Sequence, residues 1–112
     1  MRIYKVLRHD EYRALISAGR SSGAPVDLAD GYIHLSTGAQ LDETLARHFA
    51  GETGLMLLEL ESDALAPLKW EPSRGGALFP HLYRELRKDD VLRETALKPG
   101  PDGRMIGEFS WD

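Results

Sequence analysis

The 112-residue sequence contains no cysteine. This absence excludes disulfides, cysteine-ligated zinc and a thiolate nucleophile, and it is typical of a reducing compartment. The sequence also lacks an apolar run of membrane-spanning length, and residues 1–5 lead into a strand-like segment without an apolar signal core. We therefore expect a cytoplasmic protein that does not associate with membranes.

Positive charge is in the minority, with 14 Lys and Arg against 18 Asp and Glu, for a formal net charge of -4. This balance argues against general binding of nucleic acid through a basic face. Arg84, Arg87 and Lys88 form a local basic group, which we interpret as a solvated turn. The length predicts a single domain, residues 1–112, that buries its own core.

Hydrophobic periodicity predicts an α+β fold, because strands outnumber helices and do not alternate strictly with them. Residues 20–30 are rich in Ser, Gly, Pro and Asp and are predicted to form a long loop. A single helical turn is expected at 62–65. The predicted strands cover 3–7, 32–36, 54–60, 68–71, 91–97 and 104–109, and the two main helices cover 10–18 and 38–50.

The segment 70–83 has two prolines, two adjacent glycines and no regular period, which predicts an irregular loop. Arg74, with Ser73 and the amides of Gly75 and Gly76, suits a phosphate or carboxylate, because a guanidinium fork beside free N–H groups binds oxyanions. Glu71 is a candidate general base, and its alternative role is an ion pair with Arg74.

A second group of polar residues surrounds the predicted strand 32–36. Alternation places His34 and Ser36 on the same face of this strand. Thr37 and Gln40 have the spacing of a capping box, so a helix begins directly after the strand. A helix N-terminus with two hydroxyls nearby favours an anion; the alternative is that Thr37 is only a cap.

The sequence contains four histidines, at positions 9, 34, 48 and 81. No two of them have the i, i+4 spacing of a helical zinc site, so we expect no metal site. His48 is interpreted as a boundary residue of the second helix, whereas His34 and His81 are predicted to reach a cleft. A triad of Ser36, a histidine and an acid is a further hypothesis, but Ser36 lacks the Gly-x-Ser-x-Gly pattern.

Four blocks of this sequence, 30–37, 49–51, 71–76 and 79–83, resemble the signature of the DUF952 family, small bacterial domains of unknown function. The resemblance spans roughly residues 3–91. The family is grouped by fold with the ADP-ribosyltransferases, so the resemblance implies two packed, mainly antiparallel sheets around an NAD-binding cleft. In that comparison Lys5 lies on the first strand, where the ADP-ribosyltransferases have a histidine or arginine, and His34 lies where a tyrosine is common. Glu71 and Glu85 are the candidates for the glutamate that stabilises the oxocarbenium-like transition state in those enzymes.

We therefore expect a cleft that binds a nucleotide or another phosphate-bearing ligand, with NAD as the candidate substrate and ADP-ribosyl transfer or NAD glycosidic cleavage as the activity. No cofactor or protein partner is assigned. One alternative is a non-catalytic binding domain in which Arg74 and His81 brace the loop, and another is an activity like that of RNA 2′-phosphotransferases. The catalytic candidates are His34, Glu71 and His81. The candidates for binding the substrate or anion are Ser36, Thr37, Ser73, Arg74, Gly75 and Tyr83.

Overall fold

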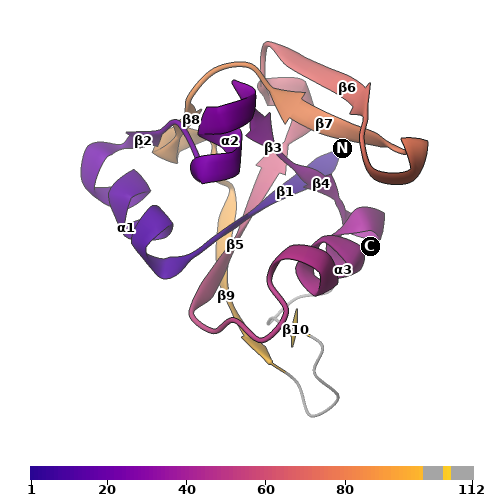
Figure 1. The fold of residues 1–112 in the computed structure, drawn as a ribbon. Helices are drawn as coiled ribbons and strands as arrows, with labels where there is room; N and C mark the ends of the chain where they lie inside the picture. The colour runs from indigo at the N-terminus through magenta and orange to yellow at the C-terminus, as the bar shows by residue number, and fades with distance from the viewer. Residues whose placement is uncertain (100–104, 107–112) are drawn as a thin grey trace.

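A five-stranded antiparallel sheet forms the centre of the fold, with the strand order β10-β9-β5-β1-β4 (Figure 1). The structure is a computed structural model that describes residues 1–99 and 105–106, without the side chains of Arg74, Pro99, Met105 and Ile106. In this part of the chain the class is α+β, with three antiparallel sheets. The strands of the central sheet are β1 (Arg2–Leu7), β4 (Ser36–Thr37), β5 (Leu55–Glu61), β9 (Arg93–Pro99) and β10 (Met105–Ile106).

Two smaller sheets and three helices surround the central sheet. The three-stranded sheet contains β3 (Ile33–His34), β7 (Leu78–Leu82) and β6 (Leu68–Pro72), and the two-stranded sheet pairs β2 (Arg20–Ser21) with β8 (Leu86–Arg87). The helices are α1 (His9–Ala18), α2 (Pro25–Asp30) and α3 (Gly38–His48), and short 3₁₀ turns cover Ser62–Ala64, Arg74–Gly76 and Lys88–Asp90.

Alternate residues of β1 and β5 point to opposite sides of the central sheet, and each side packs against a buried hydrophobic cluster. One buried cluster joins Ile3 and Leu7 of β1 to Leu15 of α1 and to residues of β3 and β7. The other joins Tyr4 and Val6 to the apolar stripe of α3. Lys5 shares the face of Ile3 and Leu7 by alternation, so the fold places an amine inside a buried surface.

Several elements form where local patterns predicted them. The helix predicted over 10–18 is α1, and Gly19 ends it in the left-handed conformation with φ 79°. The predicted capping box begins α3: Thr37 Oγ1 accepts the Gln40 N–H, and Gln40 Oε1 accepts the Thr37 N–H. The apolar run at 54–60 forms β5, and a 3₁₀ turn follows it at Ser62–Ala64.

The prediction of a long loop over 20–30 was wrong, because this segment contains β2 and α2. Pro25 stands at the start of α2, where its missing N–H is not needed. The Asp27 carboxylate accepts the Ala24 N–H at 2.7 Å and so caps the first turn from within. A six-residue helix has too little apolar periodicity to be seen in a sequence; the buried contacts of Asp27 stabilise it.

The prediction that 70–83 is irregular was also wrong, because β6 and β7 form a hairpin over most of it. Trp70 lies opposite Pro80 in this ladder. Proline has no N–H to donate and is therefore unusual in a central strand. The Pro80 carbonyl can still accept, and it accepts the Leu35 N–H at 3.0 Å. The two glycines act at the tip of the hairpin, where Gly75 and Gly76 have φ angles of 65° and 81° that favour glycine.

The predicted strand 32–36 is divided between two sheets, since β3 belongs to the three-stranded sheet and β4 to the central sheet. β4 pairs with β1 only at Ile3 and Tyr4. The edge of β1 from Lys5 onward therefore has no partner strand on that side among the described residues. This free edge positions the candidate site.

The remaining differences concern the number of layers and the C-terminal strands. The expectation was two packed sheets with two main helices, whereas the described residues form a third small sheet and the additional helix α2. The predicted antiparallel pair near the C-terminus is confirmed by β9 and β10. The turn predicted at 98–103 and the strand predicted to 109 extend into residues outside the described part.

Candidate functional site

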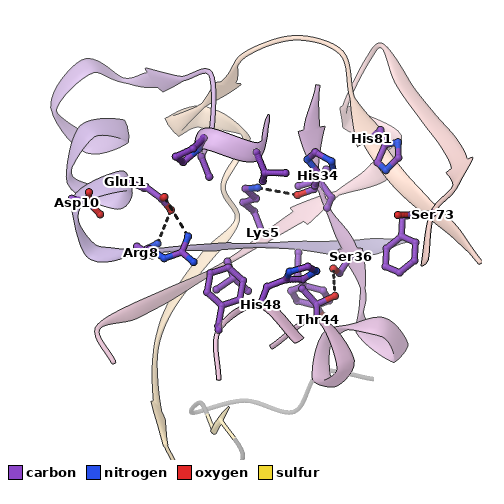
Figure 2. A pocket seen from close by; sticks show the side chains of 18 residues that line it. Lys5, Arg8, Asp10, Glu11, His34, Ser36, Thr44, His48, Ser73 and His81 are labelled. Carbon is purple, nitrogen blue, oxygen red and sulfur yellow. Dashed lines mark hydrogen bonds and ion pairs between the residues drawn. The ribbon is translucent and has the colours of Figure 1, made fainter. Parts of the chain in front are cut away.

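A cleft of about 740 Å³ opens at the free edge of β1 and is lined by residues of β1, β3, β4, α2, α3 and β7 (Figure 2). Small-molecule sites in proteins typically measure about 300–1,000 Å³. Tyr4, Phe49 and Phe79 contribute aromatic surface. The basic and hydroxyl side chains on the lining include Lys5, Arg8, His34, Ser36, His48 and His81. The carboxylates of Asp10 and Glu11 in α1 also line the cleft.

Lys5 and Asp27 form a buried ion pair beside the cleft, 22 residues apart in the chain. Lys5 Nζ lies 2.8 Å from Asp27 Oδ2 and also donates to the His34 carbonyl at 3.1 Å. The side chains are 7% and 0% exposed. Burial alone would raise the pKa of Asp27, but the hydrogen bond from the His34 ring and the charge of Lys5 lower it to about 2. Asp27 is therefore an anion that joins α2 to β1 and β3.

His34 lies between two carboxylates. Its Nδ1 is 2.7 Å from Asp27 Oδ1 and its Nε2 is 2.9 Å from Asp30 Oδ2. Ionised carboxylates only accept hydrogen bonds, so both contacts are made together only when both ring nitrogens carry a proton. The Asp27 carboxylate also accepts the His34 backbone N–H at 2.9 Å, which fixes the ring against α2.

The buried His81 is paired with Glu71 and Tyr83, which are partly exposed. His81 Nδ1 is 2.8 Å from Glu71 Oε1, and the Tyr83 hydroxyl donates to the same oxygen at 2.6 Å. The hydrogen bonds from Tyr83 and His81 lower the pKa of Glu71, and the Glu71 carboxylate raises the pKa of Tyr83 to about 12. Glu71 is thus ionised at neutral pH, and the Nδ1 of His81 is the donor.

The two histidines are neighbours because β3 and β7 pair at these positions, His34 opposite His81. Their rings meet edge to face with centroids 5.4 Å apart. Tyr32 stacks on His81 at 4.2 Å and contacts the His34 ring at 4.6 Å. Figure 2 shows Lys5, His34 and His81 on one side of β1, and Ser36 with Thr44 on the other.

The structure brings some of the predicted site residues to the cleft and leaves others away from it. His34, His81, Ser36 and Ser73 line the cleft. Glu71 and Tyr83 lie against His81 and are not among the lining residues. Within the described residues, Ser36 contacts Thr44 at 3.0 Å rather than a histidine, so the Ser36 triad does not form.

The polar groups of Thr37 and of the β6–β7 hairpin tip form hydrogen bonds within their own segments. The Thr37 backbone and hydroxyl are both used in the capping box of α3, and Thr37 does not line the cleft. At the tip, the Gly76 N–H donates to the Ser73 carbonyl at 2.9 Å, and Gly75 is exposed away from the lining. The Arg74 side chain, central to the predicted anion clamp, lies outside the described part of the structure.

Sequence reasoning missed Asp27 and Tyr32, and it did not include Lys5 among the site candidates. The signal for Lys5 was present, since a lysine inside the apolar strand Ile3–Leu7 needs a buried counter-charge. Nothing local marked Asp27 as that partner. Arg8 also lines the cleft, but Glu52 holds its guanidinium through contacts of 2.7 and 3.0 Å.

The described residues contain neither a cluster of metal ligands nor a membrane-spanning helix. No group of three or more His, Cys, Asp or Glu side chains there is arranged to hold a metal ion. Among the same residues, no helix has both the length and the apolar character needed to cross a membrane.

Comparison with known proteins identifies relatives that cover most of the chain. The family described as "Protein of unknown function (DUF952)" matches residues 6–94. The crystal structure of Protein CC0527 from Caulobacter crescentus is 50% identical, with a TM-score of 0.90, over 95% of this chain and 94% of that chain. The solution NMR structure of the same protein is 51% identical, with a TM-score of 0.83, over 92% and 90%. No curated protein matches the chain.

Proposed function

Because the chain belongs to the DUF952 family, whose description assigns no activity, we propose a function from the cleft itself: it binds a phosphorylated nucleotide, with NAD as the candidate. The observation that supports this proposal is the meeting of basic, hydroxyl and aromatic side chains in one cleft of about 740 Å³. A nucleotide presents both an anion and a flat ring, and this lining offers partners for each.

The phosphate of the ligand would lie near Lys5 and Ser36. A lysine has three donors, and among the described residues Lys5 uses two of them, for Asp27 and the His34 carbonyl. The third donor of Lys5 remains for a phosphate oxygen, and the Ser36 hydroxyl, which contacts Thr44 at 3.0 Å, can donate to a second oxygen when it accepts from Thr44. Hydrogen bonds to a charged group contribute about 1.5–3 kcal/mol each, roughly twice those between neutral groups.

The base or nicotinamide ring would lie against Phe49 and Phe79. Both rings line the cleft, and the Arg8 guanidinium lies over Phe49 at 4.7 Å from its centroid. Offset stacking of a ligand ring on such a surface contributes about 0.5–1.5 kcal/mol beyond area burial. The aromatic end and the phosphate end together orient the ligand along the free edge of β1.

The ADP-ribosyltransferase-like architecture belongs to the same proposal. Its support is a cleft at the point where the chain crosses from one antiparallel sheet to another, between β3 and β4. ADP-ribosyl transfer also needs an anionic group facing the ribose to stabilise an oxocarbenium-like transition state. Glu71 faces His81 and Tyr83 instead, so binding is the better-supported part of the proposal.

Calorimetric titration of the full chain with NAD, ADP-ribose, AMP and inorganic phosphate tests the proposal. We expect binding of at least one nucleotide below millimolar concentration and weaker binding of phosphate alone. Ser36→Ala should weaken the binding about tenfold, since it removes one donor to a charged oxygen. Ser17→Ala, on the exposed side of α1, is the matched control and should bind like the wild type. Absence of heat for every nucleotide at millimolar concentration would refute the proposal.

A further inference from the structure

We propose that His34 and His81 form a general acid–base pair that hydrolyses a small phosphodiester bound in the cleft. The inference rests on the proposed function, since it concerns the same cleft and the same class of phosphorylated ligand. The two residues lie directly opposite each other in the β3–β7 ladder and both line the cleft. Their ring centroids are 5.4 Å apart, a separation that one phosphate group spans.

His34 has the environment of the acid. Contacts of 2.7 Å to Asp27 and 2.9 Å to Asp30 place a carboxylate at each ring nitrogen, so an N–H at either position has an acceptor. The Asp30 side chain is 45% exposed, and ion pairs that are open to solvent contribute little to stability. A ligand oxygen therefore replaces Asp30 at Nε2 at little cost, whereas the buried Asp27 keeps the ring in place.

His81 has the environment of the base. Its single carboxylate, Glu71, accepts the Nδ1 proton, which leaves the lone pair of the neutral ring on Nε2. The side chain is 3% exposed, and within the described residues no group hydrogen bonds to Nε2. A nearly buried, unpartnered acceptor on the wall of a cleft is the arrangement that accepts a proton from a bound water.

Glu71, Tyr83 and Tyr32 act as positioning residues for His81. Glu71 fixes the tautomer, the Tyr83 hydroxyl holds Glu71 at 2.6 Å, and the stacked Tyr32 ring limits rotation of the imidazole. The ladder creates this group, because Glu71 lies opposite Phe79 and therefore diagonally beside His81 on one face. The same carboxylate stabilises the imidazolium that forms when His81 takes a proton.

The reaction needs water as its only co-reactant. The water oxygen forms a bond to phosphorus while its proton passes to His81 Nε2. The bond from phosphorus to the leaving ribose oxygen breaks, and the Nε2 proton of His34 passes to that oxygen. The product is a phosphate monoester, and solvent returns the proton from His81 to His34. Lys5 Nζ, which lies beside His34 at 3.1 Å from its carbonyl, has a third donor for a non-bridging oxygen, where negative charge develops.

A nucleoside 2′,3′-cyclic phosphate is the substrate class that fits best. The cleft has the volume of a small-molecule site, and a net charge of -4 disfavours a polymeric nucleic acid. A cyclic ester also has its leaving oxygen held on the ligand, close to the phosphorus and both rings.

The test incubates the full chain with adenosine 2′,3′-cyclic phosphate and measures AMP by chromatography. We expect turnover by the wild type and a loss of 100-fold or more in kcat/KM for both His81→Asn and His34→Asn, because general acid–base groups contribute about 10²–10⁴-fold. His9→Asn changes an exposed histidine that is not among the cleft-lining residues and should retain wild-type turnover. Glu71→Gln should lower kcat with KM unchanged, which a merely structural role would not produce.

Binding of the product 3′-AMP, measured by calorimetry, separates the two proposals. Variants that bind 3′-AMP within threefold of the wild type but do not turn over the cyclic phosphate support the acid–base assignment. A wild type that binds nucleotides without hydrolysing the cyclic phosphate, or variants that hydrolyse it as the wild type does, overturn the assignment and leave the proposed function standing. If His81→Asn does not fold, His34→Asn decides, since that ring is 28% exposed.

Discussion

The buried Asp27 carboxylate offers the sharpest test of how the cleft is held together. It accepts hydrogen bonds from the Ala24 N–H, the His34 N–H, His34 Nδ1 and Lys5 Nζ, at distances between 2.7 and 2.9 Å. Asp27→Asn keeps the shape of the side chain, removes its charge and replaces one acceptor oxygen with a donor NH₂ group. The substitution therefore tests the charge and the second acceptor rather than packing.

The loss of stability expected for Asp27→Asn follows from the four donors around the carboxylate. Whichever way the new amide rotates, its NH₂ group faces two of them: either Lys5 Nζ and the Ala24 N–H, or the two nitrogens of His34. Lys5, 7% exposed, also loses its counter-charge. Breaking a buried pair on one side costs about 3–5 kcal/mol, which is a large part of the roughly 5–15 kcal/mol that holds a domain folded.

Urea unfolding at pH 7, followed by circular dichroism, measures this loss of stability. The matched control is Asp30→Asn, which removes the exposed carboxylate from the same His34 ring. We expect the control to change the free energy of unfolding by less than about 1 kcal/mol. If Asp27→Asn costs no more than Asp30→Asn, the buried pair does not stabilise the fold and the argument from its geometry is refuted.

Two further predictions concern pH and the start of α3. Folding lowers the pKa of Asp27 from 3.8 to about 2, so its contribution to stability is complete above pH 4 and is lost as the pH falls toward 2. This contribution is about 2 kcal/mol, and the difference in unfolding free energy between pH 5 and pH 2 should shrink by this amount in Asp27→Asn; an unchanged difference would contradict the assignment. Thr37→Ala removes the acceptor of the Gln40 N–H and should cost about 1 kcal/mol in urea unfolding without weakening nucleotide binding, because Thr37 does not line the cleft. Weaker binding by this variant would instead restore the predicted anion site at the N-terminus of α3.

The elements that the sequence alone determined are those whose signals are local. Alternation in residues 3–7, the apolar run of β5 and the capping box of α3 each come from neighbouring residues, and each formed as predicted. The chemistry-bearing residues His34, Ser36, Glu71 and His81 were also visible, because polar side chains stood beside apolar strand positions. Local patterns carry this information because backbone hydrogen bonds and side-chain periodicity act over a few residues.

Only the tertiary structure decided how these residues act together. The hairpin register places Glu71 beside His81 rather than on the cleft lining, and the β3–β7 ladder places His34 opposite His81. Asp27 holds the wall of the cleft together because α2 packs it against Lys5, 22 residues away in the chain, where the loss of water makes the pairing necessary. Strand register and the pairing of buried charges depend on contacts between distant segments, and no local pattern in the sequence contains them.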